Sequence, residues 1–291
     1  VSIKSKRLVN RGFMRGPFLP LYGCGAIMML MVSKPFQENL VLVYIAGCLG
    51  ATVLEYVTGV TMEALFKVRY WDYSKNKFNF QGHICLGSSL AWGGLTILMT
   101  EVIHKPVERL VLSIPGRYLG IITFLLSVYI CVDFALSFKA ALDLRDILVQ
   151  MERAKEEMMR IQKRLDVIIA LTEEDWSSRK SEFADGLALR KGEIKEGISM
   201  RMEDVKAQID ETLEKLKNLA QTKPNAYLDS VKEEIFDLKV KYKSSLDYRS
   251  RLGKLKDFFQ RGLIRSNPTM NSEKFKEALE ELKKNSQKKR K

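Results

Sequence analysis

Four long apolar runs in the first half of the chain constrain its fold more than any other feature. Their lengths are close to the roughly 20 residues that a helix needs to cross a bilayer. The runs are residues 16–33, 39–62, 84–103 and 118–138. The first has no charged residue, and each of the others contains one acid: Glu55, Glu101 and Asp133. A soluble core does not need four such runs so close together, so we predict an all-α fold that begins with a bundle of four transmembrane helices.

The chain changes character near residue 140. Residues 1–140 contain 14 of the 48 Lys and Arg residues and 7 of the 35 Asp and Glu residues, and the remainder contains 34 and 28. The second half is therefore soluble by composition, and the length fits about two domains. We predict a transmembrane domain over 1–140, a cytoplasmic helical coiled-coil region over 141–265, and a short helix with a basic tail over 266–291. That last helix is expected to begin at Asn271 or Ser272.

The distribution of basic residues predicts the orientation in the membrane. Residues 1–15 carry five Lys and Arg and no acid, and the connection at 63–83 carries four. The two connections on the opposite side carry one and three. We therefore predict a multi-pass protein of the cell membrane in which residues 1–15, residues 63–83 and everything after Lys139 face the cytoplasm.

The fourth apolar run is expected to continue into a cytoplasmic helix, because no Gly or Pro lies between Gly120 and Gly186. Apolar residues in this stretch recur at steps of three and four, which is typical of a heptad seam that needs a partner helix. They are Leu144, Ile147, Met151, Ala154, Met158, Ile161, Leu165 and Ile168. Two further seams run from Ile198 to Leu219 and from Leu228 to Tyr242. We predict that the first seam pairs with a later one or with a second copy of the chain.

Motifs for catalysis or metal binding are missing from the sequence. The four cysteines lie in apolar runs without a CxxC pair, which indicates neither a disulfide framework nor a zinc site. His83 and His104 have no partners at metal-ligand spacing. The GxxxxGK[ST], GxSxG and HExxH patterns do not occur. We expect no metal, no cofactor and no enzymatic activity, and any ATPase must be a separate chain. The basic residues of the second half alternate with acids, which argues against nucleic-acid binding.

Several unusual strings follow one another at close spacing. They are NRGFMRGPFLPLYG (10–23), LEYVTG (54–59), RYWDYS (69–74), FNFQGHICLGSSLAWG (78–93) and RSNPTMNSEKFKEALEELKK (265–284). Together they resemble the ABC-transporter permease family of the CmpB type, ABC-transporter type IV, which occurs mainly in Gram-positive bacteria. The resemblance is specific over residues 8–94. It implies a permease-like membrane component that works with a separate ATPase. Relatives carry another apolar helix before the NRGF string, so we expect that one N-terminal helix is missing here.

The motif residues and the intramembrane acids are the candidate functional positions. An acid within an apolar span costs roughly 2.5 to 3.5 kcal/mol or more, so it tends to face protein or water and to mark a functional site. Glu55 is the first candidate and Asp133 the second, and we predict that they lie at similar depth, which allows direct coupling. The candidates are Gly16, Pro17, Pro20, Tyr22, Gly23, Glu55, Tyr56, Gly59, Trp71, Asp72, Tyr73, Asn79, Trp92 and Asp133.

Structural interpretations of the same motifs stay open. The prolines and glycines at 16–23 either create a broken helix, as in transporters, or a simple kink where the chain enters the first span. The aromatic and basic residues at 69–80 either form a ligand-binding loop or anchor the protein to anionic lipid. Small residues four apart, such as Gly47 and Ala51, predict close helix packing.

Two functions fit this sequence. The first is a permease-like transport component; four helices are few for a translocation path, so it needs to form a homo-oligomer or to join other membrane subunits. The second is a membrane-anchored scaffold or signalling adaptor, favoured by a cytoplasmic half whose apolar seams need partners. Proteins that co-purify from native membranes distinguish them, because only the first requires an ATPase.

Overall fold

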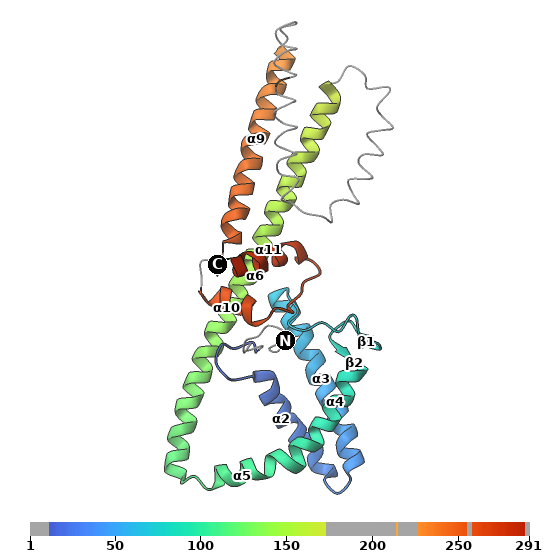
Figure 1. Cartoon of the computed structure of the whole chain (residues 1–291), viewed down its shortest axis with the longest axis vertical. Coiled ribbons are helices and arrows are strands. Elements are labelled where there is room, and N and C mark those ends of the chain that lie inside the picture. Colours follow the sequence, from blue (N-terminus) through green and yellow to red (C-terminus); the bar gives the residue numbers. More distant parts are fainter. Residues whose placement is uncertain (1–11, 173–213, 215–225, 255–257, 289–291) are drawn as a thin grey trace. The chain divides into compact units, whose positions relative to one another are not determined.

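The computed structural model describes residues 12–172, 214, 226–254 and 258–288, and these are mostly helical (Figure 1). The predicted seam from Ile198 to Leu219 therefore lies almost wholly outside the described residues. The chain forms two compact units. The first combines Val1–Val149 with Gly253–Lys291, and the second is Gln150–Leu252.

Three helical stretches in the described residues are long and apolar enough to cross a membrane: Leu40–Phe66, Leu86–Leu112 and Gly116–Ile168. The first is α3. The second joins α4 (Leu86–Ile97), a π-helical turn (Leu98–Ile103) and α5 (His104–Leu112). The third belongs to α6 (Gly116–Thr172), which runs without a break as the sequence indicates.

Two of the predicted spans differ from the helices that form. The run at 16–33 gives α2 (Pro20–Ser33), whose 14 residues measure about 21 Å, because the segment before Pro20 is irregular. Pro20 stands at the first helical position, where its missing N–H is not needed. A short 3₁₀ turn (Lys34–Phe36) then leads towards α3. The run at 84–103 continues as helix to Leu112, through residues that we expected to form a connection.

Helix α3 packs closely on α4 through small residues. The side chain of Asn39 caps α3 by accepting hydrogen bonds from the N–H groups of Val41 and Leu42. Buried positions then recur every four residues along one face: Val43, Gly47, Ala51, Glu55 and Gly59. A Cβ atom at Gly47 would clash with Thr96 of α4, and one at Gly93 would clash with Cys48. Glycine at both positions lets the two backbones approach each other.

The connection after α3 folds into a small hairpin of β1 (Asn79–Phe80) and β2 (Ile84–Cys85), paired antiparallel. Beside the end of α3, Phe13 makes ring contacts with Phe66, Phe134 and Phe138, at centroid distances of 5.5, 5.7 and 6.5 Å. The segment before α2 is therefore packed between the end of α3 and the middle of α6.

The C-terminal part of the first unit contains α10 (Phe258–Ser266) and α11 (Lys276–Lys288). The hydroxyl of Ser272 accepts a hydrogen bond from the N–H of Phe275, at 3.2 Å. Helix α11 begins at Lys276, a few residues after the predicted start at Asn271 or Ser272. This part is well packed, with buried apolar side chains at Leu263, Ile264, Met270, Phe275, Leu279 and Leu282.

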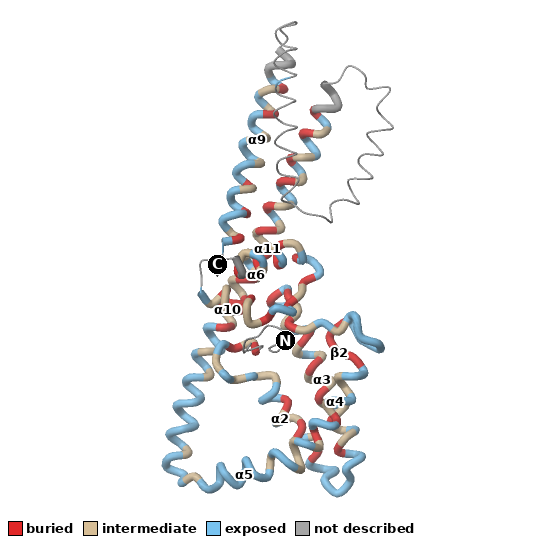
Figure 2. The backbone as a smooth tube through the Cα atoms, in the orientation of Figure 1, coloured by how far each residue is buried: buried red, intermediate tan, exposed pale blue. Residues whose placement is uncertain are grey.

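In the second unit, residues of the first and third seams share an apolar core. Ile161, Leu165 and Ile168 of α6 pack with Val231 and Ile235 of α9 (Ala226–Gly253). Figure 2 shows buried positions recurring along one side of each helix. Arg164 and Glu234 form an ion pair at 2.8 Å across the two helices. The exception in the first seam is Ile147, which is half-buried, while its neighbour Leu148 is fully buried.

Candidate functional site

Glu55 is the centre of the candidate site. It lies in the small-residue face of α3 and is only 5% exposed. One carboxylate oxygen accepts a hydrogen bond from the hydroxyl of Tyr73, at 3.0 Å. The other accepts one from the indole N–H of Trp92, also at 3.0 Å. The loop after α3 and helix α4 therefore each supply one donor to the same buried acid.

The neighbours of Glu55 come from the separate motifs that the sequence singles out. The ring of Tyr22, on α2, lies 6.1 Å from that of Trp92. Trp92 precedes Gly93, the residue that brings α4 close to α3. Four of the predicted candidates, Tyr22, Glu55, Tyr73 and Trp92, are thus brought together from three helices and one loop.

Within the described residues, the hydrogen-bond partners of the Glu55 carboxylate are uncharged. In the parts of the chain that the structure describes, no Lys, Arg or His forms an ion pair with this carboxylate. Both of its hydrogen-bond donors are neutral. Burial, reinforced by the adjacent Glu55, raises the pKa of Tyr73 well above its usual value. The tyrosine hydroxyl therefore keeps its proton and remains a donor.

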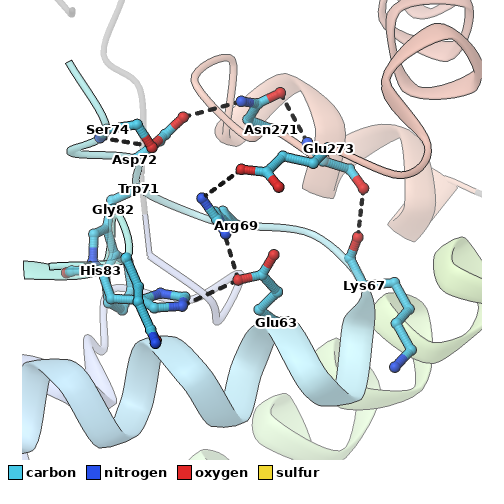
Figure 3. Close-up of polar contacts among 12 residues, drawn as sticks. Glu63, Lys67, Arg69, Trp71, Asp72, Ser74, Gly82, His83, Asn271 and Glu273 are labelled. Carbon is cyan, nitrogen blue, oxygen red and sulfur yellow. Dashed lines mark hydrogen bonds and ion pairs between the residues drawn. The ribbon is translucent and has the colours of Figure 1, made fainter.

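A second polar cluster surrounds Arg69, at the end of α3 (Figure 3). Arg69 Nε donates to Glu63 Oε2 at 2.8 Å, and Nη1 pairs with Glu273 Oε1 at 3.2 Å. His83 Nε2 lies 3.1 Å from the same Glu63 oxygen. The hydrogen bond to Glu63 is the main reason that the pKa of Arg69 is raised further above its usual value.

The hairpin beside this cluster is shaped by four of the predicted candidates. Trp71 donates its indole N–H to the carbonyl of His83, at 2.9 Å. A Cβ atom at Gly59 would lie 3.0 Å from His83 Nδ1 and 3.3 Å from the Trp71 ring, so glycine leaves room for both. Asn79 holds the turn by donating to the carbonyl of Asn76 at 2.8 Å. Tyr56 donates to Gln81 at 3.1 Å. These residues position the loop that carries Tyr73.

The C-terminal segment pairs with the edge of this loop. The N–H of Arg69 donates to the carbonyl of Asn271 at 2.7 Å, and the N–H of Asn271 donates to that of Arg69 at 2.9 Å. Asn271 Nδ2 also donates to Asp72 Oδ2 at 3.0 Å, and Ser272 Oγ to the carbonyl of Lys67 at 2.7 Å. Burial would raise the pKa of Asp72, but hydrogen bonds from Ser74 and Asn271, together with Arg69, outweigh it and lower that pKa.

Asp133 belongs to a different centre. Its carboxylate accepts a hydrogen bond from the N–H of Gly16, at 2.8 Å. A Cβ atom at Gly16 would lie 2.7 Å from the hydroxyl of Tyr129 and 2.9 Å from Asp133, so the ends of these side chains would have to shift if the position were not glycine. No hydrogen bond joins Asp133 to Glu55 within the described residues, and the direct coupling that we considered finds no support in their contacts.

Pro17, Pro20 and Gly23 form no hydrogen bond with either polar cluster among the described residues. Pro20 starts α2, and Gly23 donates its N–H to the carbonyl of Leu19 at 3.0 Å. Pro17 is exposed. Conversely, sequence reasoning did not select Glu63, Arg69, His83, Asn271 or Glu273. The available signal was an acid and an arginine at the end of an apolar run, together with the order of the RYWDYS and RSNPTMNSEKF strings.

The comparisons with known proteins agree with the motifs. No curated protein and no solved structure matches the chain. Residues 1–138 match the model of a family described as "Putative ABC-transporter type IV". This range ends within α6 and contains Glu55 with all of its partners. The family match and the apolar helices together indicate a membrane protein. Over residues 1–138, therefore, the chain is similar to the family described as "Putative ABC-transporter type IV".

Proposed function

We propose that this protein is a permease-like component of a membrane transport assembly, with Glu55 as its intramembrane functional group. The observation that carries the proposal is a buried acid, among apolar helices, whose two partners are neutral donors. Acids within apolar spans are rare because they are costly, and they usually mark ion or substrate pathways. Since no cation among the described residues pairs with it, Glu55 is suited to bind a cationic group.

The proposed topology has four crossings, formed by α2, α3, α4 with its continuation, and α6. Helix α2 is shorter than the hydrocarbon core of about 30 Å, so the irregular residues 12–19 complete its passage. Contacts of Phe13 with Phe66 and Phe134 support a common side for the N-terminal segment, the end of α3 and the middle of α6. The pairing of Arg69 with Asn271 supports the same side for the C-terminal segment. The excess of Lys and Arg makes this side cytoplasmic.

The proposed partners follow from what the sequence lacks. The chain has no phosphate-binding loop, so ATP hydrolysis is assigned to a separate subunit, and we expect the chain itself not to be an enzyme. The apolar side chains of α6 from Tyr118 to Leu136 are largely exposed in the single chain. Lipid, a second copy or another membrane subunit is expected to cover them.

A tagged full-length protein, purified from native membranes and placed in lipid nanodiscs, tests the proposal. We expect a nucleotide-binding ATPase to co-purify, and we expect Glu55→Gln to change the ATPase rate of the assembly without dissociating it. Glu101→Gln is the matched control, because Glu101 pairs with Lys105 at 2.6 Å and is more exposed than Glu55. Absence of an ATPase from the purified material, or equal rates for wild type and Glu55→Gln at every pH, would reject the proposed role.

A membrane-anchored scaffold is the second candidate. The observation in its favour is that Gln150–Leu252 forms a compact unit of its own, with a helix pair of soluble character. In that case the same purification recovers soluble proteins other than an ATPase. Their binding would depend on α6 and α9 and would be unaffected by Glu55→Gln.

A further inference from the structure

The loop that supplies Tyr73 to Glu55 is held from outside by the C-terminal segment. Ser272, Asn271 and Glu273 contact Lys67, Arg69 and Asp72, across about 200 residues of sequence (Figure 3). The Arg69 and Asn271 backbones exchange two hydrogen bonds in the manner of an antiparallel pair. Met270 and Phe275, on either side of this contact, are buried. The segment is therefore a firmly packed edge against which the loop docks.

The docked loop ends at Tyr73, whose hydroxyl donates a hydrogen bond to Glu55. Tyr73 directly follows Asp72, the last loop residue that Asn271 contacts. Its N–H donates to the carbonyl of Gly82 at 2.8 Å, and its side chain reaches the carboxylate. A shift of residues 67–73 away from Asn271 would move Tyr73 and remove one of the two hydrogen bonds to Glu55.

We propose that residues 270–275 are a latch that holds the 67–73 loop closed over Glu55, and that undocking of the loop opens this carboxylate to water on the loop side. The inference rests on the proposed role of Glu55 and adds a control element to that site. In this arrangement the C-terminal segment, which lies outside the family match, governs access to the buried acid inside it.

The contacts around the 67–73 loop are of two kinds. Some persist when the loop leaves the latch, and others can be replaced by water. Glu63, Arg69 and His83 form a largely buried group that stays satisfied when the latch opens, because Arg69 keeps Glu63 as its partner. Glu273 is 74% exposed, and Asp72 is also exposed, so water can replace their latch contacts. The hydroxyl of Tyr70 is buried without a hydrogen-bond partner among the described residues, and it would gain water when the loop moves. The buried Tyr70 hydroxyl therefore favours undocking of the loop from the latch.

Two readouts on the full-length protein in nanodiscs test the latch, and neither requires transport or ATP hydrolysis. Hydrogen exchange, read by mass spectrometry, reports the amides of residues 67–73. A water-soluble carbodiimide, used at low dose with excess glycine ethyl ester, reports water access to Glu55. A failure of the proposed transport role would leave both results interpretable.

The release variant is Asn271→Ala with Ser272→Ala, which removes the side-chain bonds to Asp72 and Lys67. We expect amide exchange at 67–73 to rise at least about tenfold and labelling of Glu55 to rise severalfold. The matched control is Asn285→Ala with Ser286→Ala, which changes the same residue types in α11. Asn285 donates to the carbonyl of Gly253 and Ser286 to that of Lys283, away from the loop. We expect the control to leave both readouts at the wild-type level.

Two further variants complete the test. Tyr73→Phe removes the covering hydroxyl directly, so labelling of Glu55 should rise while amide exchange at Arg69 stays low. Asn271→Ala alone keeps the Ser272 cap of α11 and replaces the double variant if that one does not fold; it should raise both readouts to a smaller extent. The proposal is overturned if the release variant leaves labelling of Glu55 unchanged, whether or not exchange rises, or if the control pair raises both equally.

Discussion

Helix α3 carries two acids, the buried Glu55 and the half-buried Glu63, and the partners of the two differ in charge. Glu63 is matched by charge: Arg69 donates to it at 2.8 Å, and His83 lies within 3.1 Å. Glu55, two turns earlier, accepts hydrogen bonds from the neutral donors Tyr73 and Trp92 and from no cation among the described residues. A charge-matched acid at the end of a span serves the architecture, because its pairing ties the loop to the helix. An acid without a counter-charge does not gain that pairing energy, so its retention calls for a functional explanation.

The largest loss of stability is expected when the pairing of Glu63 with Arg69 is broken. Arg69→Met leaves Glu63 without its arginine, and we expect it to lower the free energy of unfolding by about 2 to 4 kcal/mol. Thermal unfolding in detergent micelles measures this. Lys105→Met is the control, because its exposed pair with Glu101 should contribute less than about 1 kcal/mol. Equal losses in the two variants would contradict a structural role for the Arg69 cluster.

The next effect concerns Asp133, an acid within the apolar part of α6, which lies close to the backbone of Gly16. Gly16→Ala places a Cβ atom 2.7 Å from the hydroxyl of Tyr129, and we expect a loss of about 1 to 3 kcal/mol in the same unfolding measurement. Gly23→Ala is the paired change, because nothing lies within 4 Å of a Cβ atom there. Since Gly23 is inside α2, alanine should be neutral or stabilising by up to about 1 kcal/mol. A reversed order would show that residues 12–19 do not pack on α6 as described.

Glu55→Gln tests the other acid of this comparison, for which we propose a functional role. The amide keeps the shape and loses the charge, so we expect the free energy of unfolding to change by no more than about 1 kcal/mol. At the same time the ATPase rate of the assembly should change, as proposed above. A stability loss as large as that of Arg69→Met would place Glu55 among the architectural groups instead.

The smallest effect is a pH dependence at the loop edge. The pKa of Asp72 is lowered in the folded protein, so its contribution to stability is present above the ordinary pKa of about 4 and is lost as the pH falls through the lowered value. We expect Asp72→Asn to be less stable than wild type at pH 6, by under about 1 kcal/mol because the group is exposed. The difference should vanish in the acid range. Unfolding curves at several pH values check this, and a difference that persists at pH 2 would exclude ionisation as its cause.

Local patterns in the sequence predict much of this architecture. Apolar runs predict the helices, the seam from Leu144 to Ile168 predicts a buried face, and Gly47 and Ala51 predict close packing of α3. Glu55 stands out because a charged residue within an apolar run is costly. Each of these inferences uses spacing or composition within one segment. In each case the residues that form the pattern are also the residues that produce the structural feature.

Other features depend on contacts that no local pattern records. The pairing of Arg69 with Asn271 joins segments about 200 residues apart, and neither has strand periodicity. In the irregular segment before the shorter α2, the N–H of Gly16 donates to Asp133, 117 residues further along the chain. The third run continues to Leu112 through a π-helical turn, whose bonding pattern has no counterpart in a 3.6-residue period.

That π-helical turn, Leu98–Ile103, makes the stretch from Leu86 to Leu112 one residue longer than a plain α-helix would need. Each residue of an α-helix turns the chain by about 100°. The extra residue therefore sets which way the charged side of α5, with Lys105 and Arg109, faces relative to the Glu55-contacting side of α4. Regular α-helical winding of the same residues would swing that charged side by about a quarter of a revolution, whereas deleting a single residue from this turn would restore regular winding and keep the charged side facing as it does now.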